Sequence, residues 1–227
     1  MQRRVPKFDP QLVPIQVASL DAPAVHSDLL NTHGLRKRFE QEKPWEPELT
    51  DESRKSIEYS QGKGKRIAAV LIPIVQKETH LSVLLTKRAE HLNDHAGQIS
   101  FPGGRKEDTD IDIRHTALRE AHEEIGLAHH YVEALGLLPD YFTITGYQVT
   151  PVVGLVNSVQ DLNPDPNEVA EIFEVPLAFL MNPANHQIRE WRGEDSHRRF
   201  YAMPYESKFI WGATAGMLRN LYHFLRA

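Results

Sequence analysis

Two apolar stretches separated by a short polar break dominate the hydrophobic pattern of this chain. Residues 66–76 read RIAAVLIPIVQ, and residues 81–88 read LSVLLTKR. Short apolar runs rich in Val, Ile and Leu are typical of buried β-strands. Because proline cannot donate a hydrogen bond to a sheet ladder, Pro73 predicts an edge position or a bulge in the first stretch.

Weaker strand patterns surround one strongly helical segment. Within residues 112–125 apolar side chains recur every three or four positions, and Gly126 follows as a C-cap, so we expect a helix over this span. Short helical pieces are expected near residues 168–173 and 176–181, and a last amphipathic helix over 213–225. The other predicted strands are residues 98–101, 131–138, 148–156, 187–192, 199–203 and 208–211.

The N-terminal quarter has a different character. Residues 1–27 hold four prolines with little periodicity, which predicts an extended arm. Ser27 or Asp28 then caps a helix that ends near Gln41. Residues 50–65 are polar and end in Gly-Lys-Gly-Lys, a flexible approach to the apolar part of the chain.

These patterns divide the chain into two parts. Residues 1–60 form an N-terminal extension made of the arm and one helix, and residues 61–227 form the main domain. Mixed strands with helices on both faces predict an α/β fold, specifically an α/β/α sandwich.

Composition excludes several functional classes. The chain has 227 residues, which suits one domain with an extension, and its net charge of −5 argues against a broad nucleic-acid-binding surface. It contains no cysteine, so disulfides, thiol nucleophiles and zinc–thiolate sites are excluded. The longest wholly apolar run has nine residues, too few to span a membrane, and the N-terminus lacks the apolar core of a signal peptide. We therefore expect a cytoplasmic protein without nucleic-acid or membrane partners.

The predicted helix over 112–125 carries three closely spaced carboxylates, Glu120, Glu123 and Glu124. At about 100° per residue they span roughly 100° of arc, so their charges repel one another and weaken the isolated helix. A divalent cation would reverse the sign of that cost, and Mg²⁺ is usually held by one or two carboxylates together with substrate phosphates. The alternative is an exposed helix with a solvated glutamate face. Ala121 and Ile125 lie on the stripe that must pack on the sheet, which leaves the carboxylates at its edge.

Residues 101–127, FPGGRKEDTDIDIRHTALREAHEEIGL, resemble the signature box of the Nudix hydrolases, which cleave nucleoside diphosphates linked to another group. The matching residues are Gly104, Arg119, Glu120, Glu123, Glu124 and Gly126. Upstream, LLTKRA at 84–89, Gly97 and the FPGG turn are similar to the coenzyme A pyrophosphatase branch, as is WGATAG at 211–216. The resemblance covers residues 66–227.

The resemblance implies a Nudix-type α/β/α sandwich with a mixed sheet. It also implies metal-dependent hydrolysis of the diphosphate in coenzyme A or acyl-coenzyme A, which gives (acyl-)4′-phosphopantetheine and adenosine 3′,5′-bisphosphate. The cofactor is then Mg²⁺ or Mn²⁺. The implied metal ligands are Glu120, Glu123 and Glu124, the catalytic base is Glu168 or Glu123, and the substrate-binding residues are Arg88, Gln98, Phe101, Gly103 and Gly104.

Several residues have a structural alternative. Gly103 and Gly104 are equally expected in a turn that only needs close packing, and Phe101 could be a core residue. Glu168 could be a carboxylate at a helix start, stabilised by the macrodipole. Arg119 is expected to pair with Glu123 one turn on rather than to meet substrate. Asp110 lies nine residues before Arg119, one more than in the general box, so a metal contact there is open.

Two other functions stay open. Asn93 stands where the coenzyme A branch has arginine, and asparagine cannot offer a guanidinium fork to a phosphate. That keeps ADP-ribose, NADH or another nucleoside diphosphate derivative as an alternative substrate. A non-catalytic, nucleotide-binding Nudix-like module is a third reading, although such a module would not need all three glutamates. The extension of residues 1–60 could also serve as a dimerising or partner-binding arm.

Overall fold

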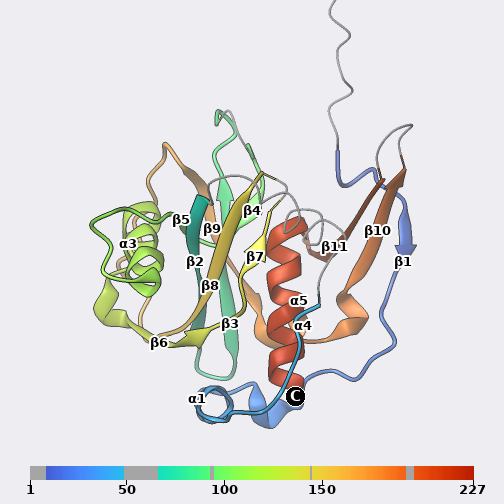
Figure 1. Cartoon of the computed structure of the whole chain (residues 1–227), viewed down its shortest axis with the longest axis horizontal. Helices are drawn as coiled ribbons and strands as arrows, with labels where there is room; N and C mark the ends of the chain where they lie inside the picture. The colour runs from blue at the N-terminus through green and yellow to red at the C-terminus, as the bar shows by residue number, and fades with distance from the viewer. Residues whose placement is uncertain (1–8, 49–65, 93–94, 144, 193–196) are drawn as a thin grey trace, which may run out of the picture.

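Four layers follow one another in the computed structural model, which describes residues 9–48, 66–92, 95–143, 145–192 and 197–227 (Figure 1). Helix α3 covers one face of an eight-stranded sheet, helix α5 covers the other face, and a four-stranded sheet lies beyond α5. The helices are α1 (Thr32–Glu40), α3 (Ile113–Ile125), α4 (Leu177–Leu180) and α5 (Gly212–Arg226), with short 3₁₀ turns η1 (Ser27–Leu29), η2 (His129–Tyr131) and η3 (Pro183–Asn185).

The larger sheet is mixed. It contains β2 (Arg66–Gln76), β3 (Leu81–Arg88), β4 (Ile99–Ser100), β5 (Gly103–Arg105), β6 (Val132–Leu137), β7 (Tyr141–Phe142), β8 (Tyr147–Val156) and β9 (Val169–Pro176). The smaller sheet is antiparallel and contains β1 (Ile15–Val17), β10 (Gln187–Arg192), β11 (His197–Tyr205) and β12 (Lys208–Trp211). The expected α/β class and α/β/α core are confirmed, and the four-stranded sheet adds a layer.

Strand β2 lies inside the sheet, so the edge position or bulge predicted from Pro73 is wrong. It pairs in parallel with β8 without a register shift, and on its other side it pairs first with β5 and then with β3. The amide of Leu71 donates to Pro102 on that second side. Amides two residues apart point the same way, so the missing donor of Pro73 faces the gap between β5 and β3.

Residues 168–173 were expected as a short helical piece, and this is also wrong. They enter β9, which pairs antiparallel with β3 from Ser82 to Arg88. The segment NEVAEIFEV has glutamates at helical spacing, but the hydrogen bonds that β3 offers along its whole length outweigh that weak local preference.

The described N-terminal residues pack against the rest of the fold, whereas an extended arm was expected. Strand β1 pairs with β10 at the edge of the smaller sheet, which the sequence did not indicate. Helix α1 begins later than expected, because Asn31 rather than Ser27 or Asp28 caps it by accepting from the Gly34 amide at 2.9 Å. The predicted boundary near residue 60 and the Gly-Lys-Gly-Lys segment lie outside the described residues.

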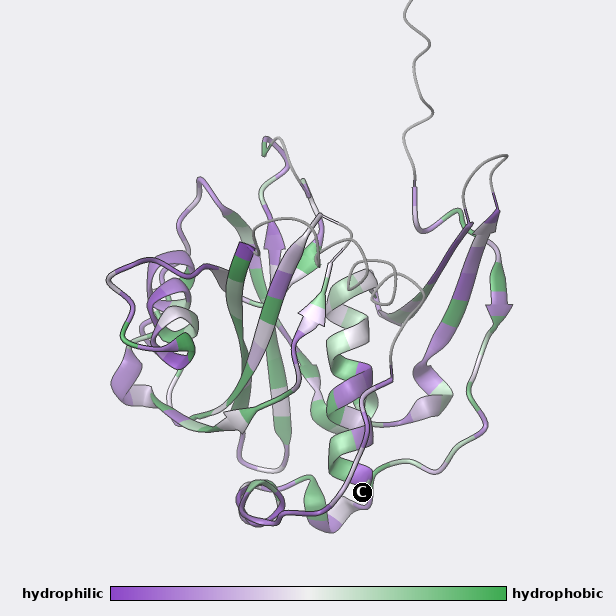
Figure 2. Cartoon of the chain, in the orientation of Figure 1, coloured by the Kyte–Doolittle hydropathy of each residue, from purple (hydrophilic) through white to green (hydrophobic). Residues whose placement is uncertain are grey.

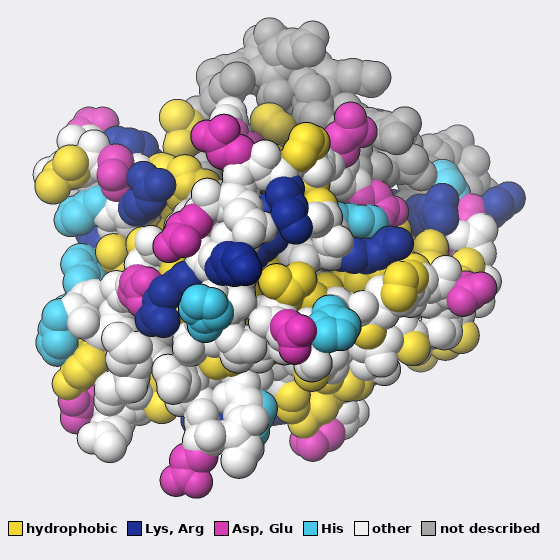
Figure 3. All heavy atoms as spheres, turned by 90° about the horizontal axis from the view of Figure 1, so that it is seen from below, with side chains coloured by type: hydrophobic (Ala, Val, Ile, Leu, Met, Phe, Trp, Pro, Cys, Tyr) yellow, Lys and Arg dark blue, Asp and Glu magenta, His cyan; other side chains and the backbone are white. Residues whose placement is uncertain are grey.

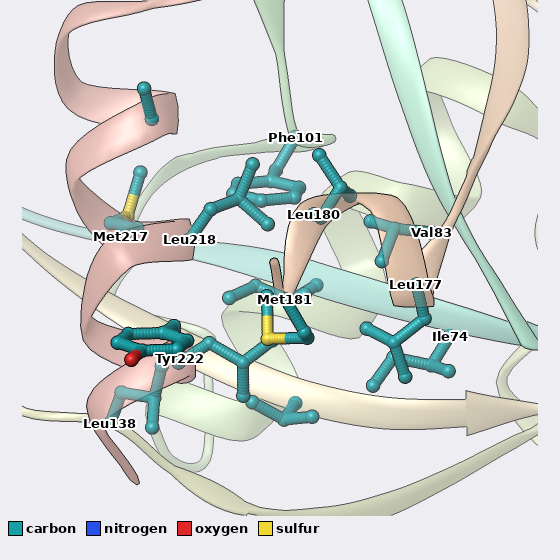
Figure 4. Close-up of a cluster of buried hydrophobic side chains, with 14 of the residues drawn as sticks. Ile74, Val83, Phe101, Leu138, Leu177, Leu180, Met181, Met217, Leu218 and Tyr222 are labelled. Carbon is teal, nitrogen blue, oxygen red and sulfur yellow. The ribbon is translucent and has the colours of Figure 1, made fainter. Parts of the chain in front are cut away.

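Helix α5 was expected to be amphipathic, yet 11 of its 15 residues are buried. The two sheets enclose it from both sides, and its ribbon is mostly pale to green in the hydropathy colouring (Figure 2). Leu218 and Tyr222 face Phe101 and Met181 in the main core (Figure 4). A second core forms on the other face of the larger sheet, where Ala117 of α3 packs together with Ala121 and Ile125, the two residues predicted to do so.

A buried histidine lies behind α5. The Nε2 of His186 donates to the Leu180 carbonyl at 2.7 Å, so its Nδ1 is left to accept from Arg219 Nη1 at 3.3 Å. Burial lowers the pKa of His186 to about 4 from 6.5. The imidazole is therefore neutral in the folded chain at neutral pH.

Acid is expected to destabilise the fold through this residue. The unfolded chain binds a proton at His186 near pH 6.5, and the folded chain does so only near pH 4. The stability that His186 contributes is thus complete above pH 6.5 and is lost as the pH falls towards 4. The unfolding free energy of the unchanged protein should fall between pH 7 and pH 5. We expect this fall to be about 2 kcal/mol smaller in His186→Gln. Urea unfolding at both pH values measures this difference, and His33→Gln, at an exposed position, is the control. An equal fall in the unchanged protein, His186→Gln and His33→Gln would contradict the role of His186.

Charge and hydropathy agree with this architecture. Acidic and basic side chains are interspersed on the face seen from below (Figure 3). None of the helices in the described ranges combines the length and apolar character needed to cross a membrane.

Candidate active site

Four chain segments meet at one end of the larger sheet. Strand β3 runs antiparallel to β2 and ends there at Arg88, and β9 begins there directly after Glu168. Strand β5, which holds Gly103 and Gly104, pairs with the first half of β2. Helix α3 lies beside β5 on the outer face (Figure 1). The sheet register therefore brings together residues that are up to 80 positions apart in the chain, from Arg88 to Glu168.

The two glycines of the turn lie against two carboxylates of α3. A Cβ placed on Gly104 would come within 2.5 Å of both carboxylate oxygens of Glu120. The Gly103 amide donates to the carboxylate of Glu124. The side chain of Glu124 is only 6% exposed. The close packing expected of this turn is thus present, and the role of Gly103 and Gly104 in substrate binding stays a prediction.

The electrostatics of Glu124 are unusual for a glutamate. Burial, followed by the negative charge of Glu168 and then of Glu120, raises the pKa of Glu124 to about 8. Arg88, whose Nη1 lies 4.0 Å from the Glu124 carboxylate, and the Gly103 amide oppose the rise. A carboxyl whose pKa is raised by burial and by like charges is a candidate functional group.

Glu120 shows the same influences more weakly. Burial raises the pKa of Glu120, with further increases from Glu123 and Glu168, while Arg119 lowers it. We name Glu120, Glu124 and Glu168 the carboxylate cluster. Two of its members come from one face of α3, and the third comes from the loop before β9.

A second set of contacts holds α3 against the loop before it. The Asp110 side chain is 0% exposed and accepts from Arg119 Nε at 2.9 Å. It also accepts from His115 Nδ1 and from Thr116 Oγ1, each at 2.9 Å. Hydrogen bonds from Arg119 hold the pKa of Asp110 well below its usual range, together with donors from Glu107, Thr116 and His115 that outweigh burial. Asp110 is an anchor for Arg119, a role that the loop spacing left open.

Arg119 connects this anchor to the site. Its Nη2 lies 3.0 Å from Glu120 and donates to the Arg105 carbonyl at 2.9 Å, and its Nη1 donates to Glu123 at 2.8 Å. The expected pairing with Glu123 is present. That pairing draws Glu123 to the outer flank of α3, where its side chain is 57% exposed. The structure thus separates Glu123 from the buried Glu124.

Of the remaining residues predicted to bind substrate, one faces the carboxylate cluster and the others have structural positions. Arg88 faces the cluster, and its Nε is buried without a hydrogen-bond partner among the described residues. Gln98 accepts from His95 Nδ1 at 2.8 Å, and its carbonyl accepts from the Arg88 amide at 2.9 Å, so it supports the end of β3. Phe101 is 2% exposed in the main core, which corrects its expected role in a substrate slot (Figure 4). Asn93 lies outside the described residues.

The cluster fits a divalent cation. In the described ranges, no three His, Asp or Glu side chains lie close enough together to form a complete metal site by themselves. Mg²⁺ does not need one, because it keeps several waters and binds through one or two carboxylates plus substrate phosphates. Glu120 and Glu124 offer two such carboxylates, and a positive charge beside them would offset their repulsion from Glu168.

The two glycines are expected to respond differently to alanine. In Gly104→Ala the new methyl meets the movable end of Glu120, so the fold survives and the carboxylate shifts; we expect about a hundredfold loss of turnover. In Gly103→Ala the methyl meets backbone, the Ala69 carbonyl at 2.3 Å and the Val70 Cα at 2.6 Å, and we expect a fall in thermal stability as well. Thermal unfolding and steady-state turnover of both variants measure this. Equal stability losses in the two variants would contradict the assignment.

The chain resembles known proteins over much of its length. A family model described as NUDIX domain matches residues 65–201. Proteins named uncharacterized Nudix hydrolase NudL, from Escherichia coli O7:K1 and Shigella boydii serotype 18, are each 45% identical over 157 residues, which cover 69% of this chain and 81% of the relative. Among solved structures, the Nudix hydrolase RenU from M. smegmatis matches with a TM-score of 0.43 and 23% identity, over 51% of this chain and 73% of its own.

Proposed function

This chain belongs to the Nudix hydrolase family, and from that premise we propose that it hydrolyses the diphosphate linkage of coenzyme A or acyl-coenzyme A. The products are (acyl-)4′-phosphopantetheine and adenosine 3′,5′-bisphosphate. The observation that carries the proposal is the carboxylate cluster beside the glycine turn and Arg88, at one end of the sheet. The substrate rests on the resemblance of LLTKRA, FPGG and WGATAG to the coenzyme A branch.

Nudix hydrolases use divalent metal ions, and we propose Mg²⁺ or Mn²⁺ here, held by Glu120 and Glu124. When bound, the ion supplies polarisation of the diphosphate and a lower pKa for a coordinated water. Glu123 was expected as a third ligand. Its exposure and its pairing with Arg119 favour a supporting role, in which it balances the charge of the arginine that holds Glu120.

Glu168 is our candidate for the base that accepts a proton from the attacking water. It is exposed, it precedes β9, and its charge acts on both Glu120 and Glu124, so it faces the same site. The alternative of a helix-start carboxylate does not apply, because the following segment is a strand. Glu123, the competing base, lies on the flank of α3. A base must reach its water directly or through one other water.

Arg88 is proposed to orient the diphosphate. A guanidinium can donate two parallel hydrogen bonds to phosphate oxygens, and Arg88 has a buried Nε without a protein partner among the described residues. In the reaction a water oxygen attacks one phosphorus, the bond from that phosphorus to the bridging oxygen breaks, and two phosphate monoesters leave. The proton released by the water passes to the base.

A substrate panel tests this proposal. Coenzyme A, 3′-dephospho-coenzyme A, ADP-ribose and NADH are each incubated with Mg²⁺ or Mn²⁺, and the products are identified by mass. We expect coenzyme A to have the highest kcat/KM and to give phosphopantetheine and adenosine 3′,5′-bisphosphate. Reaction in ¹⁸O-water shows which phosphorus is attacked. Preference for ADP-ribose or NADH would overturn the assignment of coenzyme A as substrate. Absence of turnover with all four compounds would support a non-catalytic nucleotide-binding module.

A further inference from the structure

A second charged group lies at the same end of the sheet as the carboxylate cluster. Arg66 begins β2, Tyr147 begins β8 and pairs with it, and Arg105 ends β5. Arg105 Nε donates to the Tyr147 hydroxyl at 2.7 Å. The guanidinium carbons of Arg66 and Arg105 lie 5.1 Å and 5.3 Å from the centre of the Tyr147 ring. Two cations therefore share one aromatic side chain.

The two guanidinium groups of Arg66 and Arg105 have no acidic partner among the residues that the structure describes. No carboxylate of the described ranges forms an ion pair with Arg66 or Arg105, whereas Arg88 and Arg119 each have one. Burial raises the pKa of Tyr147, but hydrogen bonds to Arg105 and Arg66 outweigh it and lower the pKa overall. Like charges that are held together without an anion favour the binding of one.

The group is joined to the catalytic end through β5. Arg105 follows Gly104, whose backbone lies against Glu120, and the Arg105 carbonyl accepts from Arg119. Successive residues of a strand face opposite sides of the sheet, so Gly104 faces α3 while the Arg105 side chain faces the other side. A ligand that meets both the cluster and these arginines must therefore pass the end of β5.

We propose that Arg66, Arg105 and Tyr147 bind a phosphate monoester group of the substrate. This group is separate from the diphosphate that is cleaved. The inference rests on the proposed function, since it assigns these residues to the 3′-phosphate of the nucleoside half. Guanidinium groups match phosphate in geometry and charge. The Tyr147 oxygen already accepts from Arg105, so its own hydrogen is free to donate to a phosphate oxygen.

Binding of two nucleotides tests the inference without turnover. In Mg²⁺ buffer, calorimetry compares adenosine 3′,5′-bisphosphate with AMP for the whole chain and for Arg66→Gln, Arg105→Gln and Tyr147→Phe. The unchanged protein should prefer the bisphosphate at least tenfold, and each arginine variant should bind it about tenfold more weakly while its affinity for AMP stays the same. Tyr147→Phe should lose part of the preference. Lys37→Gln, which removes an exposed charge on α1, is the control.

The outcomes separate this inference from the proposed function. Equal binding of both nucleotides by the unchanged protein, or an equal loss for both in the arginine variants, overturns the phosphate site. The same holds if Lys37→Gln weakens the bisphosphate as much as Arg66→Gln does. Turnover is a second readout: the ratio of kcat/KM for coenzyme A to that for 3′-dephospho-coenzyme A should fall in the arginine variants. Absence of turnover with an intact binding preference would contradict the reaction and leave the site standing.

Discussion

Replacing Glu124 by Gln is expected to lower the turnover of a diphosphate substrate about a thousandfold, because the metal contribution that it removes amounts to several kcal/mol. Glutamine keeps the shape of the side chain and the contact with the Gly103 amide but loses the charge that a cation needs. Steady-state turnover at saturating Mg²⁺ measures the loss. Glu78→Gln, an exposed position in the turn between β2 and β3, is the matched control and should leave turnover unchanged.

The same variant should not be less stable than the unchanged protein when metal is absent. The pKa of Glu124 is raised because its charged form is buried beside Glu168, so a neutral side chain is easier to hold there. We expect metal-free Glu124→Gln to unfold at an equal or higher temperature. A site kept for function at a cost in stability shows this pair of effects. A variant that loses stability and activity together would indicate a structural role for Glu124.

Replacing Asp110 by Asn is expected to cost about 3 kcal/mol of unfolding free energy, because it leaves the Arg119 guanidinium without its buried counter-charge. The Asp110 side chain has no exposed surface, and an amide cannot accept from Arg119, His115 and Thr116 as a carboxylate does. Turnover should also fall, since Arg119 holds Glu120. Urea unfolding measures the first effect.

Asp108, an exposed neighbour in the same loop, supplies the control for Asp110. Asp108→Asn removes an equal charge without a buried partner and should change stability by less than about 0.5 kcal/mol. If Asp110→Asn were as stable as Asp108→Asn but failed to bind Mn²⁺, Asp110 would be a metal ligand rather than an anchor.

The sequence predicted most of the elements that bear the site. Continuous apolar runs predicted β2, β3 and β8. The periodic segment over 112–125, closed by Gly126, predicted α3, which spans Ile113–Ile125. These signals are local: they depend on side chains a few positions apart. The position of Glu120 and Glu124 on one side of α3 follows from the same periodicity.

Other features depend on contacts between distant segments, which a single sequence does not encode locally. The β9 segment has an ambiguous pattern and becomes a strand through pairing with β3. Helix α5 is buried on both sides because the second sheet, completed by β1, covers its outer face. Glu168 reaches the cluster only because β9 runs beside β3.

The roles of individual acids were harder to predict than their positions. Glu123 and Glu124 are adjacent, yet Arg119 draws Glu123 to the surface while Gly103 and Arg88 surround Glu124. The signal for Asp110 was present as an acid in a loop one residue longer than the general pattern. That signal did not indicate Arg119 as its partner, which the fold of the loop decides.

Binding of Mn²⁺, followed by electron paramagnetic resonance, is the measurement that tests the central claim most directly. The claim is that Glu120 and Glu124 remain crowded because a divalent cation completes them. Titration of the metal-free protein should show Mn²⁺ bound, and the double variant Glu120→Gln/Glu124→Gln should lose that binding while its fold, checked by circular dichroism, is retained. Equal Mn²⁺ binding by the double variant and the unchanged protein would contradict the account.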